Sequence, residues 1–304
     1  MSGTQSSLPG PLGRVWEPIR EGSRSKRALL LMAPLALFEL LIFVAPFLIL
    51  LRISVAEGSA DLRYLEGTWS LSGYVDVFTS GLLRDIVAYS FAMGLAVTVI
   101  TVVIALFYAY AIWRADGLVE SLLLFSVVLP LLTTLVIKTY AFWPLLAPSG
   151  TVNDLLLSLN LIADPIQFVP GTTGVIVGQV YIVLPYAVLA IYSVLSTMNW
   201  DVVEAARDLG ASRPRSVLEV VVPRAMPGII VATVISFAWS VGAYAAPGVL
   251  SSSLTFAIQV EDMMYGMRYP EAGAFSVLML LLMLVSVAII FTVLNRFGGE
   301  FDLA

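Results

Sequence analysis

The sequence predicts an all-α fold, a polytopic membrane protein with six transmembrane helices, and two observations support this prediction. Of the 304 residues, 59% are hydrophobic and 12% are charged, whereas soluble domains contain about 25% charged residues. Apolar runs of roughly 20 residues, long enough to cross a hydrocarbon core, recur along most of the chain. A lone segment in lipid satisfies its backbone polar groups only as a helix, so each run is expected to be helical.

The six expected spans form one membrane domain over residues 28–297, between tails at 1–27 and 298–304. The first span follows a polar, basic segment and is expected to be retained as an anchor and not cleaved as a signal peptide. The third is the least clear, because Lys138 lies near its end; this lysine is expected to extend to the membrane interface. The expected spans are Ala28–Leu51, Ile86–Trp113, Leu122–Tyr140, Gly174–Met198, Pro227–Leu250 and Ala272–Leu294.

The distribution of lysine and arginine predicts that both termini are cytosolic. With the N-terminus inside, eleven of the 16 Lys and Arg residues fall on cytosolic segments and five on the other side, in agreement with the positive-inside rule. The outer segments then contain ten carboxylates against five cationic side chains. This acidic face either attracts cations or is a by-product of sorting the positive charge inward, and the sequence leaves both readings open.

Two of the expected connecting segments are long. The outer one, residues 142–173, is rich in leucine from Leu155 to Leu161 and is expected to contain a short interfacial helix. The inner one, residues 199–223, is expected to form a helix, a glycine turn and a second helix that ends at Pro223.

The first helix of the inner segment has start and stop signals. Asp201 is expected to cap it, Glu204 to complete a capping box, and Gly210 to close it in a left-handed conformation. Ser212 is expected to cap the second helix. The expected apolar stripe consists of Val202, Ala205, Ala206 and Leu209, with Glu204, Arg207 and Asp208 beyond it. Such a helix either lies on the membrane surface or docks onto a protein partner, and its short length, mixed charge and glycine turn favour docking.

The run Glu204-Ala205-Ala206, followed by Gly210, Leu218 and Pro223, resembles the EAA loop of ABC importer permeases. Spacing, composition and the place between the fourth and fifth spans all match. The resemblance implies the type I ABC importer permease fold and a coupling helix that sits in a cleft of a separate ATP-hydrolysing subunit. The residues implied to couple to that subunit are Glu204, Ala205, Ala206, Arg207, Asp208 and Gly210.

Three further stretches, Leu129–Leu146, Val180–Leu195 and Ser240–Leu250, resemble the spermidine/putrescine branch of these permeases. The resemblance implies inward transport of a polyamine, or a similar small organic cation, by alternating access. The implied partners are two ATPase subunits, a second and related permease, and a periplasmic or lipid-anchored substrate-binding protein. The implied location is the bacterial inner membrane, in contact with lipid, and no nucleic acid is involved.

The sequence does not predict an enzyme. It contains no Cys and no His, which excludes thiol nucleophiles, imidazole bases and histidine metal sites. ATP binding requires a GxxxxGK[ST] loop, and neither lysine, Lys26 or Lys138, follows a glycine. We therefore expect no metal and no cofactor on this chain, with ATP and Mg held by the partner ATPase subunits.

Candidates for lining the transport pathway are mostly aromatic. Aromatic faces attract ammonium groups, although aromatic residues near span ends also serve as interfacial anchors. One carboxylate lies well inside an expected span, Glu39, and a contact with another helix is expected for it more than ligand binding. The pathway candidates are Tyr140, Trp143, Gln179, Tyr181, Tyr186, Trp239 and Tyr244.

Two other functions remain as alternatives. A gradient-driven secondary transporter would show more spans, an internal repeat and a relay of buried ionisable residues. A structural membrane scaffold would transport nothing.

Overall fold

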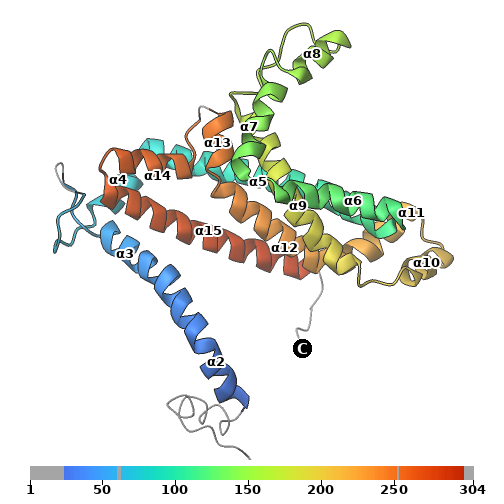
Figure 1. Cartoon of the computed structure of the whole chain (residues 1–304), viewed down its shortest axis with the longest axis horizontal. Helices are drawn as coiled ribbons and strands as arrows, with labels where there is room; N and C mark the ends of the chain where they lie inside the picture. The colour runs from blue at the N-terminus through green and yellow to red at the C-terminus, as the bar shows by residue number, and fades with distance from the viewer. Residues whose placement is uncertain (1–23, 60–62, 252, 298–304) are drawn as a thin grey trace, which may run out of the picture.

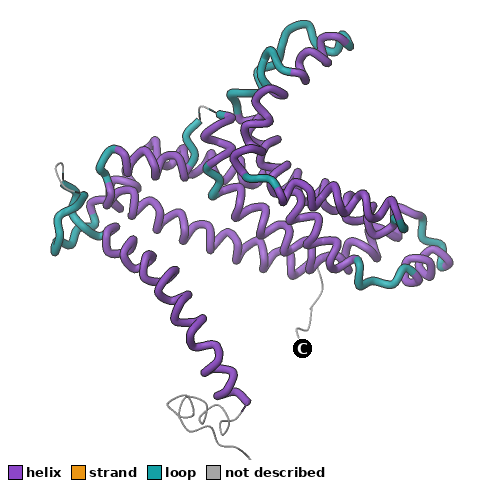
Figure 2. Tube along the Cα trace, in the orientation of Figure 1, coloured by secondary structure: helices purple, strands orange, loops and turns teal. Residues whose placement is uncertain are grey.

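The structure is a computed structural model of the chain, and it describes residues 24–59, 63–251 and 253–297. The predicted C-terminal tail and most of the predicted N-terminal tail lie outside these residues. The described residues form helices joined by loops, with no β-strand among them (Figure 2). The all-α prediction is therefore confirmed for this part of the chain.

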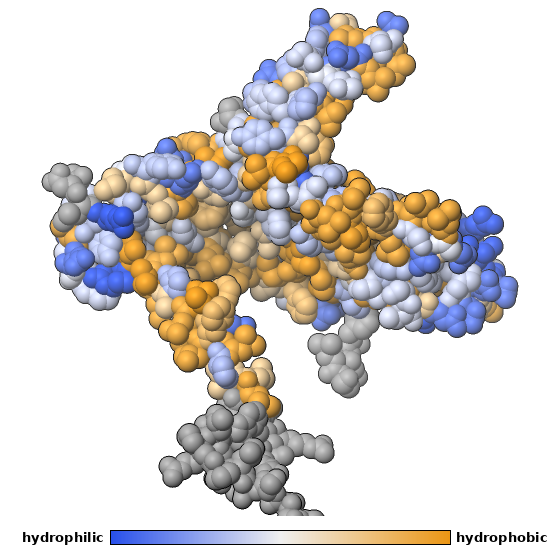
Figure 3. Space-filling model, viewed as in Figure 1, coloured by the Kyte–Doolittle hydropathy of each residue, from blue (hydrophilic) through white to orange (hydrophobic). Residues whose placement is uncertain are grey.

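Five helical stretches are long and apolar enough to cross a membrane: Leu31–Ser54, Gly81–Arg114, Thr172–Leu195, Arg213–Val241 and Tyr269–Arg296. A sixth crossing exists if Leu118–Leu132 and Leu135–Ser158, which meet at a bend of 105°, count as one span. Figure 3 shows hydrophilic residues gathered at both ends of the long axis, with a mostly apolar surface between them. This pattern suits a protein that crosses a membrane along that axis.

The centre of the molecule is a bundle of α5 (Gly81–Arg114), α9 (Thr172–Leu195) and α12 (Val222–Val241), which lie side by side (Figure 1). Its core is built from small and branched side chains, among them Ala109, Val188 and Ala232, each with 0% exposure. The α9–α12 contact is close because Gly228 of α12 has no side chain. A Cβ there would lie 2.7 Å from the Ala190 carbonyl oxygen.

Shorter helices surround this bundle. Two of them, α4 (Ser72–Thr79) and α14 (Phe256–Tyr265), lie near the start of α15 (Tyr269–Phe297), and α15 packs along α12. The predicted helix of the outer segment is confirmed as α8 (Thr151–Ser158). Asn153 of α8 closes this segment by accepting from the Ile166 amide at 2.7 Å and donating to the Ile166 carbonyl at 2.8 Å.

The first span diverges from the rest of the molecule. It runs without interruption through α2 (Arg24–Glu39), a π-helical turn η1 (Leu40–Val44) and α3 (Ala45–Ser54). Near Ser54 it contacts α15 closely enough that a Cβ on Gly273 would lie 3.1 Å from the Ser54 Cα. The span otherwise leaves the bundle (Figure 1), and its most apolar 18-residue window is 0% buried. Glu39 lies just before the π-helical turn and is exposed, so its predicted helix contact stays a prediction.

The prediction of Leu122–Tyr140 as one continuous span is wrong. Helix α6 (Leu118–Val128) ends in a 3₁₀ turn, η2 (Leu129–Leu132), and α7 (Leu135–Leu146) begins after a sharp bend. The break follows from Pro130, which has no N–H to continue the α-helical ladder, and from Thr134, which caps α7 by accepting from the Ile137 amide. Lys138 does not extend outward as expected, since its exposure is 8%.

The predicted fifth span, Pro227–Leu250, is wrong at both ends. The helix begins earlier, at α11 (Arg213–Ser216), and continues through a π-helical turn, η3 (Val217–Val221), into α12. The missing N–H of Pro223 is tolerated at the first turn of α12, directly after the π-helical turn. At the other end, Pro247 has no N–H for the Ala243 carbonyl, so the helix stops at Val241 and α13 (Ala245–Leu250) is separate.

The close approach at Gly228 gives a stability prediction. Gly228→Ala places a methyl group 2.7 Å from one backbone oxygen and 2.8 Å from the Ile191 Cα, so we expect a loss of about 1–3 kcal/mol from overpacking. The control is Gly248→Ala, whose Cβ would meet its nearest neighbour, the Ile258 Cδ1, at 4.0 Å. Thermal melting of both variants in detergent tests this, and equal melting temperatures would contradict it.

Candidate functional site

The loop between α9 and α12 has the architecture that the sequence predicts. Its first helix is α10 (Asp201–Asp208), and Gly210 follows with φ of +94°. The Gly210 amide donates to the Arg207 carbonyl at 2.9 Å, and the Ala211 amide donates to the Ala206 carbonyl at 3.1 Å. These bonds satisfy carbonyls at the end of α10. The helix, the glycine turn and a second helix starting at Arg213 are thus confirmed.

The predicted capping box of α10 is wrong. The residue at the N-cap position is Trp200, and Asp201 lies inside the helix, with its amide donating to the Asn199 side chain at 3.1 Å. The Glu204 carboxylate does not turn back to the backbone but accepts a hydrogen bond from the Trp200 indole Nε1 at 3.0 Å. The indole N–H of Trp200 thus takes the place of the backbone amide that would donate to the Glu204 carboxylate in a capping box.

The second helix also differs in detail from its prediction. Ser212 stands at its N-cap position, but its side chain makes no capping hydrogen bond. The helix does not end at Pro223, since it continues as α12 to Val241. The loop is therefore joined rigidly to the fifth span, without a break between them.

Trp200 fixes the start of α10 to the end of α5. Its ring lies 5.1 Å from the Trp113 ring between centroids, and the Arg114 guanidinium lies 3.8 Å above its centre. Aromatic pairs contribute about 0.5–1.5 kcal/mol beyond buried area, and exposed cation–π contacts about 0.5–1 kcal/mol. Next to this contact Val203, with 1% exposure, enters the core formed by α5, α9 and α12.

The opposite face of α10 has no partner within the described chain. The predicted apolar stripe is split, because Val202 and Ala206 are half-buried while Ala205 is exposed and Leu209 is 90% exposed. The buried residue, Val203, was not part of the predicted stripe. Glu204 and Asp208 are exposed as well, whereas Arg207, although also exposed, lines a cavity together with Val203 and Trp200. An uncovered face with apolar and charged side chains, held at a fixed position by Trp200, is suited to contact another protein.

Two of the pathway candidates lie together in the bundle. Tyr186 of α9 and Trp239 of α12 stack with centroids 5.4 Å apart and an interplanar angle of 28°. They are 37% and 40% exposed, so both rings remain accessible from outside the chain. Tyr181 instead packs edge-on against Phe142 at 5.3 Å.

The remaining pathway candidates have different surroundings. Tyr140 and Trp143 of α7 are 60% and 42% exposed. Gln179 is 1% exposed, with its amide nitrogen 4.0 Å from the Met93 sulfur, so it lines no open surface of this structure. The Tyr244 hydroxyl donates a hydrogen bond to Glu261, and this bond is the main cause that raises the pKa of Tyr244. Sequence reasoning missed Glu261 as a partner of the aromatic set.

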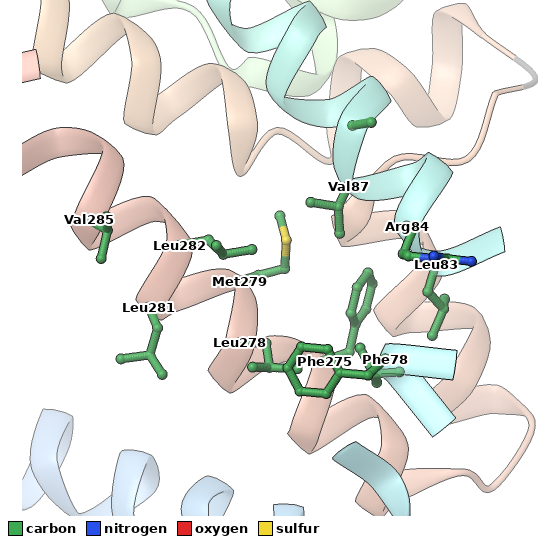
Figure 4. Close-up of a pocket in the computed structure, with 12 residues that line it drawn as sticks. Phe78, Leu83, Arg84, Val87, Phe275, Leu278, Met279, Leu281, Leu282 and Val285 are labelled. Atoms are coloured by element: carbon green, nitrogen blue, oxygen red, sulfur yellow. The ribbon is translucent and has the colours of Figure 1, made fainter. Parts of the chain in front are cut away.

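A large apolar hollow elsewhere does not suit a cation. Figure 4 shows this cavity of about 410 Å³ between α5, α15 and the end of α4. Its walls are hydrophobic side chains, such as Leu83, Phe275 and Met279, together with Arg84. Because the charged group on its wall is itself a cation, the cavity disfavours a cationic ligand.

The comparison with known families settles what kind of protein this is. Residues 101–297, more than half of the chain, match the family described as "Binding-protein-dependent transport system inner membrane component". The chain belongs to this family. It is therefore a multi-pass inner-membrane permease of the ABC type, as the EAA-like loop predicts.

Individual permeases of the family are similar to the chain over part of their length. The spermidine/putrescine transport system permease protein PotB of Escherichia coli (strain K12) is 32% identical over 170 residues, which cover 56% of this chain and 62% of that protein. PotB of Haemophilus influenzae is 31% identical over 196 residues, covering 64% and 68%. The chain thus spans less than two thirds of the Escherichia coli permease. These relatives are permease subunits and not enzymes.

Two solved structures show the same fold. A chain of a bacterial ABC transporter involved in the import of the acidic polysaccharide alginate superposes with a TM-score of 0.69 at 17% identity, covering 94% of this permease and 100% of that chain. A chain of the alginate transporter in complex with an alginate pentasaccharide-bound periplasmic protein gives a TM-score of 0.71. The predicted fold, that of an ABC importer permease, is confirmed.

The attachment of α10 gives a prediction for this permease. Trp200→Ala removes the ring contact, the cation–π contact and the bond to Glu204, so opening of α10 becomes easier by about 1–2 kcal/mol, a factor of roughly 5–30. Hydrogen–deuterium exchange over residues 201–208 measures this. Trp69→Ala is the control, because Trp69 also lies under an arginine, Arg52 at 4.4 Å, but outside this site. Unchanged exchange in the Trp200 variant would show that the ring does not hold α10.

Proposed function

We propose that the chain is a permease subunit of an ATP-driven ABC importer for polyamines, spermidine or putrescine, or for a similar small organic cation. The single observation that supports this function best is the placement of α10, a helix fixed to the bundle by one face and uncovered on the other. It lies between α9 and α12, which form most of the bundle with α5. A movement imposed on α10 would therefore reach two membrane helices directly.

The proposed driver is a separate ATPase subunit that binds the uncovered face of α10. The coupling residues of this proposal are Glu204, Ala205, Ala206, Arg207, Asp208 and Gly210, with Leu209 added by the structure because it is 90% exposed. ATP and Mg would be bound by a pair of such ATPase subunits. Closure of the pair on ATP would move α10 and switch the permease between outward and inward access.

A second, related permease completes the proposed pathway. Two features of this chain support such a partner: the first span, whose most apolar 18-residue window is 0% buried, and the accessible rings of Tyr186 and Trp239. Apolar rings on a face that meets a second permease would line a shared path through the membrane. We propose that a periplasmic or lipid-anchored binding protein delivers substrate to that path.

The proposed orientation places α10 and both termini in the cytosol. Arginines cluster at the α10 end of the long axis, where Figure 3 shows hydrophilic residues. The positive-inside rule assigns such an end to the cytosol. The opposite end would then face the periplasm and the binding protein.

Polyamine as substrate is supported by the names of the relatives and by the chemistry of the accessible rings. Spermidine and putrescine contain ammonium groups, which aromatic faces hold by cation–π attraction of about 2 kcal/mol when desolvated. The stacked pair of Tyr186 and Trp239 offers such faces, and Glu261 beside Tyr244 adds a carboxylate.

Uptake by vesicles tests this function. Vesicles containing the permease, its ATPase and its partner permease should accumulate labelled spermidine when ATP and binding protein are supplied, and an ionophore that collapses ion gradients should not stop them. Gly210→Asp should insert normally and lose at least about tenfold of uptake while ATP hydrolysis continues. The reason is that a non-glycine residue at φ of +94° costs roughly 1–2 kcal/mol and alters the turn that presents α10.

Gly67→Asp is the matched control, since Gly67 has φ of +79° and, like Gly210, nothing within 4 Å of its would-be Cβ. Its backbone strain is similar, but it lies in another loop, so uptake should be retained. Uptake without ATP that collapses with the ion gradient would favour the secondary transporter instead. Normal uptake by Gly210→Asp would refute the role of the loop.

A further inference from the structure

A second cavity lies behind α10, on the side that faces the bundle. Its volume is about 370 Å³, and it opens where the end of α5, the start of α10 and the start of α11 meet. Three arginines line it, one from each element or its neighbouring loop: Arg114, Arg207 and Arg213. Tyr110 and Trp200 form an aromatic wall.

The cavity contains positive charge without a matching carboxylate. None of the nine side chains that line it is acidic. Among the residues that the structure describes, the ion pairs are Arg215 with Glu219 and Arg268 with Glu271, and neither includes a cavity arginine. Glu204 of α10 accepts a hydrogen bond from the Trp200 indole and is not part of the lining.

The arrangement of Arg114 leaves its hydrogen-bond donors available. Its guanidinium lies 3.8 Å above the Trp200 ring centre, so the ring covers one face of the group while the N–H groups at its edge are not used by the ring. Arginine stays charged at any physiological pH, so three guanidinium groups around one cavity repel one another until an anion enters. The planar fork of N–H donors matches the oxygens of a phosphate group.

We propose that this cavity binds a phosphate group, carried either by the headgroup of an anionic phospholipid or by a soluble phosphate compound. Such a group would bridge α5, α10 and α11 and would hold α10 against the bundle, next to the contact that Trp200 already makes. The site would thereby adjust how firmly the coupling helix is held. The proposal rests on the proposed function in one respect only: that function places the cavity on the cytosolic side of the membrane.

Lipid retention tests the proposal without any transport measurement. The full chain, with its partner subunits, is purified from membranes that contain phosphatidylglycerol and phosphatidylcholine, and native mass spectrometry counts the lipids that remain bound. A parallel arm measures thermal melting in inorganic phosphate against chloride at equal ionic strength. We expect either retention of phosphatidylglycerol over phosphatidylcholine or a rise in melting temperature with phosphate.

The variants separate a built site from general surface charge. The combined change Arg114→Gln, Arg207→Gln and Arg213→Gln should weaken binding by about tenfold or more, since it removes the charge-assisted hydrogen bonds to the phosphate. The matched control removes three other arginines from segments predicted to be cytosolic, Arg215→Gln, Arg224→Gln and Arg296→Gln, and should bind as the wild type does. Arg207→Lys, which keeps the charge but loses the fork, should bind with intermediate strength.

Each outcome decides the matter. Retained phosphatidylglycerol without a phosphate effect identifies a lipid, and a phosphate effect that displaces lipid identifies a soluble compound; both support the site. Equal losses in the two triple variants would overturn it, because then positive charge alone attracts the anion. Absence of both responses in the wild type would overturn it as well, and would leave the proposed transport function untouched.

Discussion

Helices α9 and α12 meet backbone to backbone where Gly228 lies against Ala190 and Ile191, and the rest of the molecule depends on this contact. A Cβ at Gly228 would come within 2.8 Å of two backbone atoms of α9, so nothing larger than hydrogen fits. Between membrane helices, lipid supplies no hydrophobic driving force, and close packing of small residues takes its place. The loop that contains α10 joins these two helices, so both of its ends are fixed by the same close helix contact.

The placement of α10 follows from this rigidity. The second helix of the loop, α11, continues without a break through η3 into α12. Trp200 holds the start of α10 against Trp113 and Arg114 of α5. One face of α10 is thus committed to the bundle, and the other, with Leu209 and Ala205, is uncovered. In the proposed mechanism an ATPase supplies the missing partner, and the bundle passes the movement of α10 on to the membrane helices.

Sequence alone predicts what depends on local patterns. The fold class follows from apolar runs, and α10 with its closing glycine follows from periodicity and from the tolerance of Gly210 for positive φ. The breaks at Pro130 and Pro247 are harder to predict, because prolines also occur inside membrane helices: Pro185 lies within continuous α9. The contacts of Trp200 and the burial of Val203 depend on where the end of α5 lies in the fold. The residue spacing within the loop does not indicate this. The burial of Gln179 and Lys138 likewise depends on neighbours distant in sequence.

Cross-linking tests most directly whether a separate ATPase holds α10. The chain contains no cysteine, so Leu209→Cys introduces a single thiol on the uncovered face, and Leu159→Cys, at a residue that is 58% exposed, introduces one in the outer segment as a control. With the ATPase subunit present, a maleimide–benzophenone reagent attached to the thiol should, on irradiation, insert into a C–H bond of the ATPase and join it to the chain from position 209 and not from position 159. If position 209 gives no cross-linked product with the ATPase, or if its thiol is labelled from the lipid phase, α10 is not the element that the ATPase binds.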